Sequence, residues 1–173
     1  MPNRKLGRAA DQRKAILRNM TTAFVINGKV ETTVARAKEI SAITEKLISM
    51  AIKEKDNYTT KEITVSAAKL DGKGKKVLTT KTSKAGNKYE VVDREVKKKT
   101  VQVDSPSRLA ARKEIMYWLM KSHDSEGKVI NPVNKVFDEL APKYEGRTGG
   151  YTRIIRTGAR RGDGSEMAIL EFV

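Results

Sequence analysis

Nine of the thirteen arginines lie in two short segments near opposite ends of the chain. They are Arg4, Arg8, Arg13 and Arg18 in one segment and Arg147, Arg153, Arg156, Arg160 and Arg161 in the other. A guanidinium group is planar, stays charged and presents a fork of donors that matches a phosphate or a guanine edge. The two segments therefore indicate surfaces that lie against a polyphosphate, and nucleic acid is the first partner to consider.

The C-terminal arginine segment begins with Gly146-Arg147-Thr148-Gly149-Gly150-Tyr151-Thr152-Arg153. Its glycines permit a close backbone approach to a phosphate, and the Tyr151 ring offers a stacking surface or a donor to a sugar. The spacing matches neither GxxxxGKS/T nor GxGxxG, so it does not indicate nucleotide hydrolysis. A flexible linker with stray charge is the alternative, but Arg156, Arg160 and Arg161 continue the pattern and favour RNA contact.

The N-terminal arginine segment begins in a basic stretch, residues 1–8, that has few apolar side chains and is typical of an extended tail. This tail leads directly into a helical pattern, and basic arms of this kind order along RNA when they bind it. A solvated terminus is the alternative. The RNA contacts predicted here are Arg4, Lys5, Arg8, Lys14 and Arg18.

The composition of the 173 residues excludes several classes of protein. A net charge of +15 and a pI near 10.0 favour nucleic acid, since each neutralised phosphate releases counterions. An anionic membrane would also attract the chain, but no apolar run approaches the ~18 residues of a membrane span. Cysteine is absent and His123 is the only histidine. We expect a cytoplasmic protein that is not an enzyme, with no metal, cofactor, small-molecule substrate or homo-oligomer.

Hydrophobic spacing predicts helices over residues 9–27, 33–55 and 105–121 and a shorter one from Asn131. Strands are expected at Lys29–Thr32, Tyr151–Thr157 and Glu166–Phe172, where β-branched and aromatic residues gather. Helices packed on a small mixed or antiparallel sheet give an α+β fold. The expected apolar faces include Ile16, Met20, Ala23 and Phe24 in the first helix, Ile40, Ile43, Leu47, Met50 and Ala51 in the second, and Leu109, Met116, Leu119 and Met120 in the third.

The segment 58–104 differs from its surroundings because it holds twelve basic residues, eleven of them lysine, against six acidic ones. Short runs with strand propensity, separated by turns at Asp71-Gly72 and Gly86-Asn87, predict a β-hairpin insertion. Its lysines have two interpretations, as RNA contacts or as solvated charges that discourage strand pairing. The predicted organisation is a tail over 1–8, a single α+β domain over 9–57 and 105–173, and this insertion over 58–104.

Several motifs resemble those of one family. Ala15–Met20, Lys29–Thr33 and Ala35–Glu39 resemble the first half of bacterial large-subunit ribosomal protein seventeen. The run Val136–Leu140, then Arg147–Ile154 and Ala168–Glu171, resembles its ending more specifically. The resemblance covers residues 1–57 and 105–173, while shorter family members lack the segment 58–104.

The resemblance implies an α+β structural constituent of the large ribosomal subunit, bound to folded large-subunit ribosomal RNA near the exit of the peptide tunnel, beside neighbouring ribosomal proteins. It implies no catalytic role. A DNA- or RNA-binding architectural protein outside the ribosome is the alternative, although such proteins usually add apolar wedges. The RNA-facing positions that the resemblance implies are Arg4, Lys5, Arg8, Arg18, Arg147, Arg153, Arg156 and Arg160.

Overall fold

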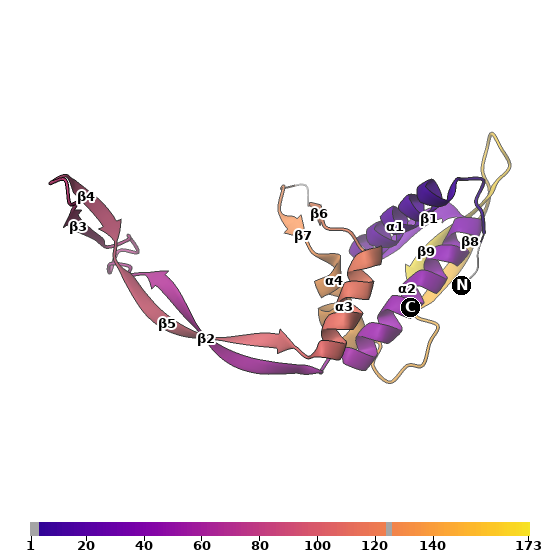
Figure 1. The fold of residues 1–173 in the computed structure, drawn as a ribbon. Helices are drawn as coiled ribbons and strands as arrows, with labels where there is room; N and C mark the ends of the chain where they lie inside the picture. The colour runs from indigo at the N-terminus through magenta and orange to yellow at the C-terminus, as the bar shows by residue number, and fades with distance from the viewer. Residues whose placement is uncertain (1–3, 124–125) are drawn as a thin grey trace. The chain divides into compact units, whose positions relative to one another are not determined.

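The computed structural model describes residues 4–123 and 126–173 and divides the chain into two compact units. The larger unit comprises residues 1–57 and 104–173, and the smaller one comprises Tyr58–Val103. Figure 1 shows their helices and strands. The elements of the larger unit are α1 (Ala10–Asn27), β1 (Lys29–Thr33), α2 (Val34–Glu54), α3 (Pro106–Trp118), β6 (Ser122–His123), β7 (Val129–Ile130), α4 (Pro132–Lys135), η1 (Val136–Leu140), α5 (Ala141–Lys143), β8 (Thr152–Ala159) and β9 (Glu166–Phe172).

The main sheet of the larger unit has three antiparallel strands in the order β1-β9-β8. Lys29 pairs with Glu171 on one side of β9, and Arg153 pairs with the same residue on the other side. Helix α2 packs against β8 and β9, and α1 packs against α2 (Figure 1). The expected α+β class is confirmed, and every pairing in this sheet is antiparallel.

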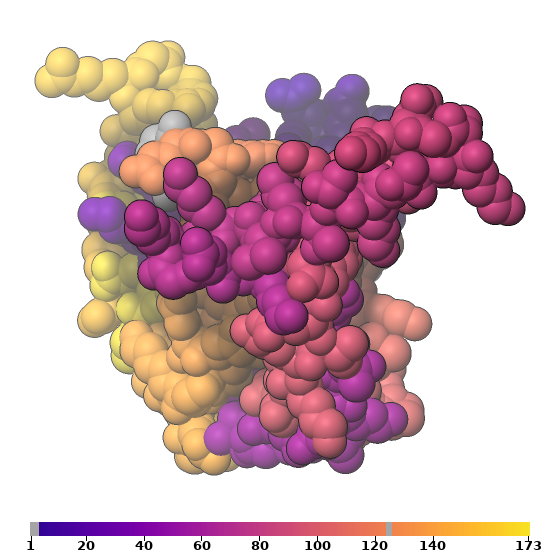
Figure 2. Space-filling view, turned by 90° about the vertical axis from the view of Figure 1, so that its left-hand side faces the viewer, coloured from indigo at the N-terminus to yellow at the C-terminus, as the bar shows by residue number. Residues whose placement is uncertain are grey.

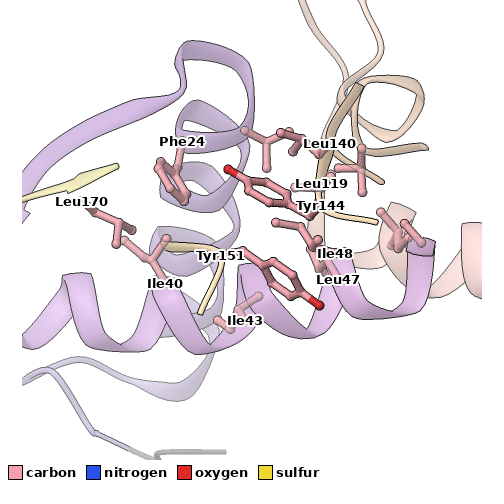
Figure 3. Close-up of a cluster of buried hydrophobic side chains, with 14 of the residues drawn as sticks. Phe24, Ile40, Ile43, Leu47, Ile48, Leu119, Leu140, Tyr144, Tyr151 and Leu170 are labelled. Carbon is pink, nitrogen blue, oxygen red and sulfur yellow. The ribbon is translucent and has the colours of Figure 1, made fainter. Parts of the chain in front are cut away.

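The hydrophobic core lies between this sheet and the helices (Figure 3). Ile40 and Leu47 of α2 and Leu170 of β9 are almost fully buried. Phe24 stacks on Phe172 with ring centroids 4.2 Å apart. The predicted stripe of the second helix is confirmed at Ile40, Ile43, Leu47 and Ala51, whereas Met50 is only half-buried.

The buried face of α1 is rotated from the predicted one. Phe24 is buried as expected, but Ile16 and Met20 are half-buried, and the stripe instead includes Leu17 and Thr21. The Thr21 hydroxyl donates to the Leu17 carbonyl oxygen at 2.7 Å, which satisfies its polar group inside the core. A pattern built only on apolar residues could not include this threonine.

The buried face of α3 also differs from the expectation. Leu109 is 43% exposed and Met116 49% exposed, while Ile115 and Leu119 are buried. Arg108 shares the buried face because it forms an ion pair of 2.6 Å with Asp104 and lies over the ring of Phe137. A buried, paired arginine is uncommon, so the apolar pattern did not include Arg108. The predicted face is confirmed at Leu119 and is wrong at Leu109, Met116 and Met120.

The predicted short helix after Asn131 is present, and the helical turns continue past Pro142. The Asn131 side chain caps α4 by accepting from the Val133 backbone N–H at 3.2 Å. The next turn, η1, is widened, so that the Ala141 N–H bonds to the Val136 carbonyl oxygen. This wider turn relieves the clash that a proline ring makes with the carbonyl four residues earlier, and α5 continues to Lys143.

The smaller unit is a β ribbon. Strands β2 (Tyr58–Ala68) and β5 (Arg94–Asp104) pair with each other, and β3 (Leu78–Thr82) pairs with β4 (Lys88–Val92). Its residues, all described, include none that is buried. Among the described residues of the whole chain, no helix has the length and apolar character to cross a membrane.

Candidate nucleic-acid interface

A shallow hollow of about 450 Å³ lies at the N-terminus of α2. It brings together cations from three places in the sequence, namely Arg4 near the N-terminus, Lys38 on α2 and Arg156 on β8. The hollow therefore joins the two arginine segments that lie at opposite ends of the chain. Its other lining residues are Thr33, Val34, Ala35, Ser165 and Glu166.

The backbone at the start of α2 adds to this positive character. Thr33 is extended, with φ −70° and ψ 147°, and its side chain makes no capping hydrogen bond. The first amide groups of a helix have no partner within the helix, and they carry a partial positive charge. Amides that are not capped by a side chain and face a hollow are suited to bind an anion such as phosphate.

Two carboxylates temper the charge of the hollow. Glu39 is 4% exposed, and its Oε1 lies 3.7 Å from the Arg4 Nε, an ion pair without a hydrogen bond. Glu166 lines the hollow itself. Three cations and the helix terminus thus face two carboxylates, and the balance is positive. An anion bound there would have Arg156 and Lys38 as its least restrained charged partners, because neither makes an ion pair among the described residues.

A second basic surface joins α1 and α3. The Lys14 Nζ lies 4.3 Å from the centre of the Tyr117 ring, and the Arg18 guanidinium lies 5.5 Å from it. Tyr117 is 49% exposed, so part of its ring stays accessible beside the two cations. This combination of cations and an aromatic ring is suited to a nucleotide. The sequence predicts RNA contacts at Lys14 and Arg18, but Tyr117 lies outside the expected apolar face of its helix and no local pattern marks it.

Tyr151 does not fit the predicted stacking role. It is only 2% exposed, and its ring packs against that of Tyr144, with the ring centroids 5.2 Å apart (Figure 3). Its hydroxyl donates to the Arg147 carbonyl oxygen at 3.0 Å. The Arg147 Nε in turn donates to the Gly149 carbonyl oxygen at 3.1 Å. Tyr151 is thus a core residue, and Arg147 helps to shape the glycine-rich loop that precedes β8.

Arg153 and Arg156 lie on opposite faces of β8. Arg156 lines the hollow, whereas the Arg153 Nε lies 2.8 Å from the Glu171 Oε1 on the neighbouring strand. Arg153 remains 58% exposed. Residues three apart on a strand are expected on opposite faces, and these two arginines agree with that expectation, so only Arg156 joins the hollow.

The turn between β8 and β9 protrudes from the larger unit, in gold in Figure 2, and holds Arg160 and Arg161. The Arg160 guanidinium donates twice to the Asp163 carboxylate, at 3.0 and 2.5 Å. The hydrogen bonds from Arg160, and then those from Ser165, hold the pKa of Asp163 well below its usual range. Arg161 is exposed on the same turn. Hydrogen bonds within the turn thus stabilise its conformation, and Arg161 remains exposed to solvent.

The segment predicted as an extended tail is folded back where it is described. The Arg8 N–H donates to the Lys5 carbonyl oxygen at 3.1 Å, which makes a turn, and Leu6 packs against the core. Leu6 supplies an apolar anchor that the low apolar content of residues 1–8 did not indicate. Lys5 and Arg8 stay exposed, and residues 1–3 lie outside the described part. Within the residues that the structure describes, no cluster of three or more histidine, cysteine or acidic residues could hold a metal ion.

Comparison with known proteins identifies the family. A profile described as Ribosomal protein L17 matches residues 16–173. The large ribosomal subunit protein bL17 of Acetivibrio thermocellus is 58% identical over 170 residues, 98% of each chain, and that of Ruminiclostridium cellulolyticum is 60% identical over the same length and coverage. The bL17 of Lachnospira eligens is 45% identical over 179 residues. The chain belongs to the ribosomal protein L17 family, as the resemblance predicted.

Proposed function

We propose that the chain is a structural constituent of the large ribosomal subunit in the bacterial cytoplasm and that it binds folded large-subunit ribosomal RNA near the exit of the peptide tunnel. Family membership supports the ribosomal assignment, because the matching relatives are named large ribosomal subunit proteins. The proposed role includes no catalytic step, and the proposed partners are this RNA and neighbouring ribosomal proteins.

The observation that carries RNA binding is the meeting of Arg4, Lys38 and Arg156 at the uncapped N-terminus of α2. A phosphate in this hollow would face charged donors and backbone amides at once, and charge-assisted hydrogen bonds are the strong ones. Because each side chain comes from a different element, only the folded larger unit presents them together. The hollow thus selects the arrangement of RNA phosphates rather than a base sequence.

Exposed cations outside the hollow extend the surface. Lys14 and Arg18 beside Tyr117 form one such extension, and the β8–β9 turn with Arg160 and Arg161 forms another. Lys5, Arg8, Arg147 and Arg153 complete the predicted set, with Arg147 and Arg153 engaged in contacts within the protein. Binding proceeds through counterion release along the RNA backbone.

The test is the salt dependence of binding to a folded large-subunit RNA fragment that contains the protein's own site. With roughly 6–10 phosphate contacts, the slope of log K against log salt concentration should be roughly −5 to −9. A slope shallower than about −2 would exclude counterion release as the main driving force. Equal affinity for duplex DNA of the same length would favour the architectural alternative.

A further inference from the structure

The ribbon formed by Tyr58–Val103 has apolar side chains but no core of its own. Leu70 is 63% exposed, Val96 is 74% exposed and Tyr89 is 48% exposed, and no residue of this described segment is buried. A two-stranded ribbon is marginally stable by itself in water. Two strands of eleven residues each, with both edges unpaired, therefore present a surface that a partner would stabilise.

The charge of the ribbon indicates a polyanion as this partner. It holds twelve basic residues against five acidic ones, a net +7 over Tyr58–Val103. Three of the acidic residues are already paired within the ribbon, in Lys69–Asp93, Lys97–Glu95 and Lys98–Glu62. The other eight lysines make no ion pair within this fully described segment, namely Lys61, Lys73, Lys75, Lys76, Lys81, Lys84, Lys88 and Lys99.

One face of the ribbon combines three lysines, two of them unpaired, with aliphatic side chains. The Lys98–Glu62 pair, at 3.5 Å, places Lys98 and Glu62 on the same face of β2 and β5. Successive side chains of a strand alternate between faces, so their neighbours lie on the opposite face. That face, here called the lysine face, carries Lys61, Ile63 and Val65 from β2 and Lys97, Lys99 and Val101 from β5. It also carries Glu95, which pairs with Lys97, so Lys61 and Lys99 are its unpaired cations.

We infer that the lysine face is a separate RNA-binding surface that lies along the phosphate backbone of large-subunit ribosomal RNA. Each strand is roughly 36 Å long at ~3.3 Å per residue, enough to follow several phosphates of one RNA strand. Lysine is a flexible point charge, so it adapts to a backbone without fixed geometry. Ile63 and Val65, at 44% and 40% exposed, lose water when sugars pack against them. This inference rests on the proposed function.

The ribbon begins and ends at one point of the larger unit. The Ser105 N–H donates to the Asn57 carbonyl oxygen at 3.2 Å, and the Asn57 side-chain amide donates to the Ser107 hydroxyl at 2.6 Å. The residues that flank the ribbon are therefore hydrogen-bonded to each other. Substitutions within Tyr58–Val103 therefore change no residue of the hydrophobic core.

The experiment compares two triple variants of the full chain that remove the same amount of charge. Lys61→Gln/Lys97→Gln/Lys99→Gln neutralises the lysine face, and Lys81→Gln/Lys84→Gln/Lys88→Gln neutralises the β3–β4 hairpin as the matched control. Salt dependence of binding is measured on the folded RNA fragment. We expect the first variant to lower the magnitude of the slope by about 2, at ~0.7–0.9 for each phosphate that the protein no longer neutralises, and the control to lower it by less than about 1.

Two further readouts decide the outcome. Chemical probing of the bound RNA should show a stretch that the native chain and the control protect and that the first variant leaves reactive. Equal slopes for the two triple variants would overturn the inference, because they would mean that only the total charge of the ribbon matters. Unchanged RNA protection with loss of a crosslink to another ribosomal protein would also overturn it, in favour of an acidic protein as the partner. Aggregation of the first variant with an unchanged slope would assign these lysines to edge protection instead. A native chain that does not bind the RNA would overturn the proposed function as well.

Discussion

The two units carry similar net charge on very different scaffolds. The larger unit has 24 basic and 16 acidic residues, a net +8 over residues 1–57 and 104–173, whereas the ribbon reaches +7 with 46 residues. All of the buried apolar residues lie in the larger unit. Arginine predominates at the proposed interface of the larger unit, while eleven of the twelve basic residues in the ribbon are lysine.

This difference separates two ways of binding a polyanion. In the larger unit a packed core holds Arg4, Lys38 and Arg156 at one helix end, so little ordering remains to be done when a phosphate binds. In the ribbon the charges stand on paired strands without a core, so each flexible lysine side chain would still have to be ordered if RNA bound there. The first arrangement favours selectivity for RNA shape, and the second favours a broad contact that depends strongly on salt.

The largest effect should come from a matched pair of isoleucine substitutions, one in each unit. Ile40→Ala removes a fully buried side chain and should lower the free energy of unfolding by about 2–5 kcal/mol. Ile63→Ala changes a residue that is 44% exposed and should stay within about 0.5 kcal/mol. Urea unfolding followed by far-UV circular dichroism measures both. An equal loss of unfolding free energy in both variants would mean that Ile63 contributes to stability as a core residue does.

A pair of arginine substitutions on β8 should have the next largest effect. Arg156→Ala removes a cation from the hollow and should weaken RNA binding by about 1.5–3 kcal/mol, the range for hydrogen bonds to charged groups. Arg153→Ala makes the same chemical change on the opposite face and should cost less, because Glu171 already occupies that guanidinium. RNA affinity at fixed salt distinguishes the variants. If Arg153→Ala proves the more damaging, the hollow is not the principal contact.

The contacts of Lys14 and Arg18 with the Tyr117 ring should make a smaller contribution, to the stability of the fold. Tyr117→Leu keeps apolar bulk but removes the ring that faces Lys14 and Arg18, and it should lower stability by about 0.5–1 kcal/mol. Tyr117→Phe retains the ring and serves as the control, with stability close to that of the native chain. Thermal unfolding compares the two. A loss as large in Tyr117→Phe would point to the hydroxyl rather than to the cation–ring contact.

The smallest effect concerns the pH dependence of the β8–β9 turn. Hydrogen bonds from Arg160 and Ser165 lower the pKa of Asp163, so the contribution of this carboxylate to stability is present above its ordinary pKa of ~3.9 and is lost only as the pH falls through the lower, folded value. A carbon-detected NMR titration of the Asp163 carboxyl should show this downward displacement. In Arg160→Ala the pKa should return toward the ordinary range, and an unchanged value there would rule out Arg160 as the cause.

The helices and strands could be predicted from the sequence because their signals are local. Gly28, with φ +77°, ends α1, and Pro106 begins α3, and glycine and proline are the usual local signals for the end and the start of a helix. The buried faces of the helices were harder to predict, since they include polar residues. Thr21 and Arg108 are buried because each has a partner at a site that only the folded structure supplies.

The candidate nucleic-acid interface could be predicted from the sequence only in part. The composition of the two arginine segments pointed to nucleic acid, but which arginines share a surface depends on sheet register and helix packing. Arg156 meets Arg4 because β8 and β9 place it beside the start of α2, while Arg153 faces away. Tyr151 resembled a stacking residue in sequence because the glycines and arginines around it suggested a loop on the surface, yet its ring lies in the core.

The hollow at the start of α2 can be tested directly because the chain contains no cysteine. A single Thr33→Cys variant places a unique thiol in the hollow, at a side chain that makes no capping bond. An iron chelate attached there, in large subunits assembled with the variant, should cleave large-subunit ribosomal RNA at one or a few neighbouring sites. The native chain treated with the same reagent is the control. Cleavage no greater than in that control would contradict RNA binding at the hollow.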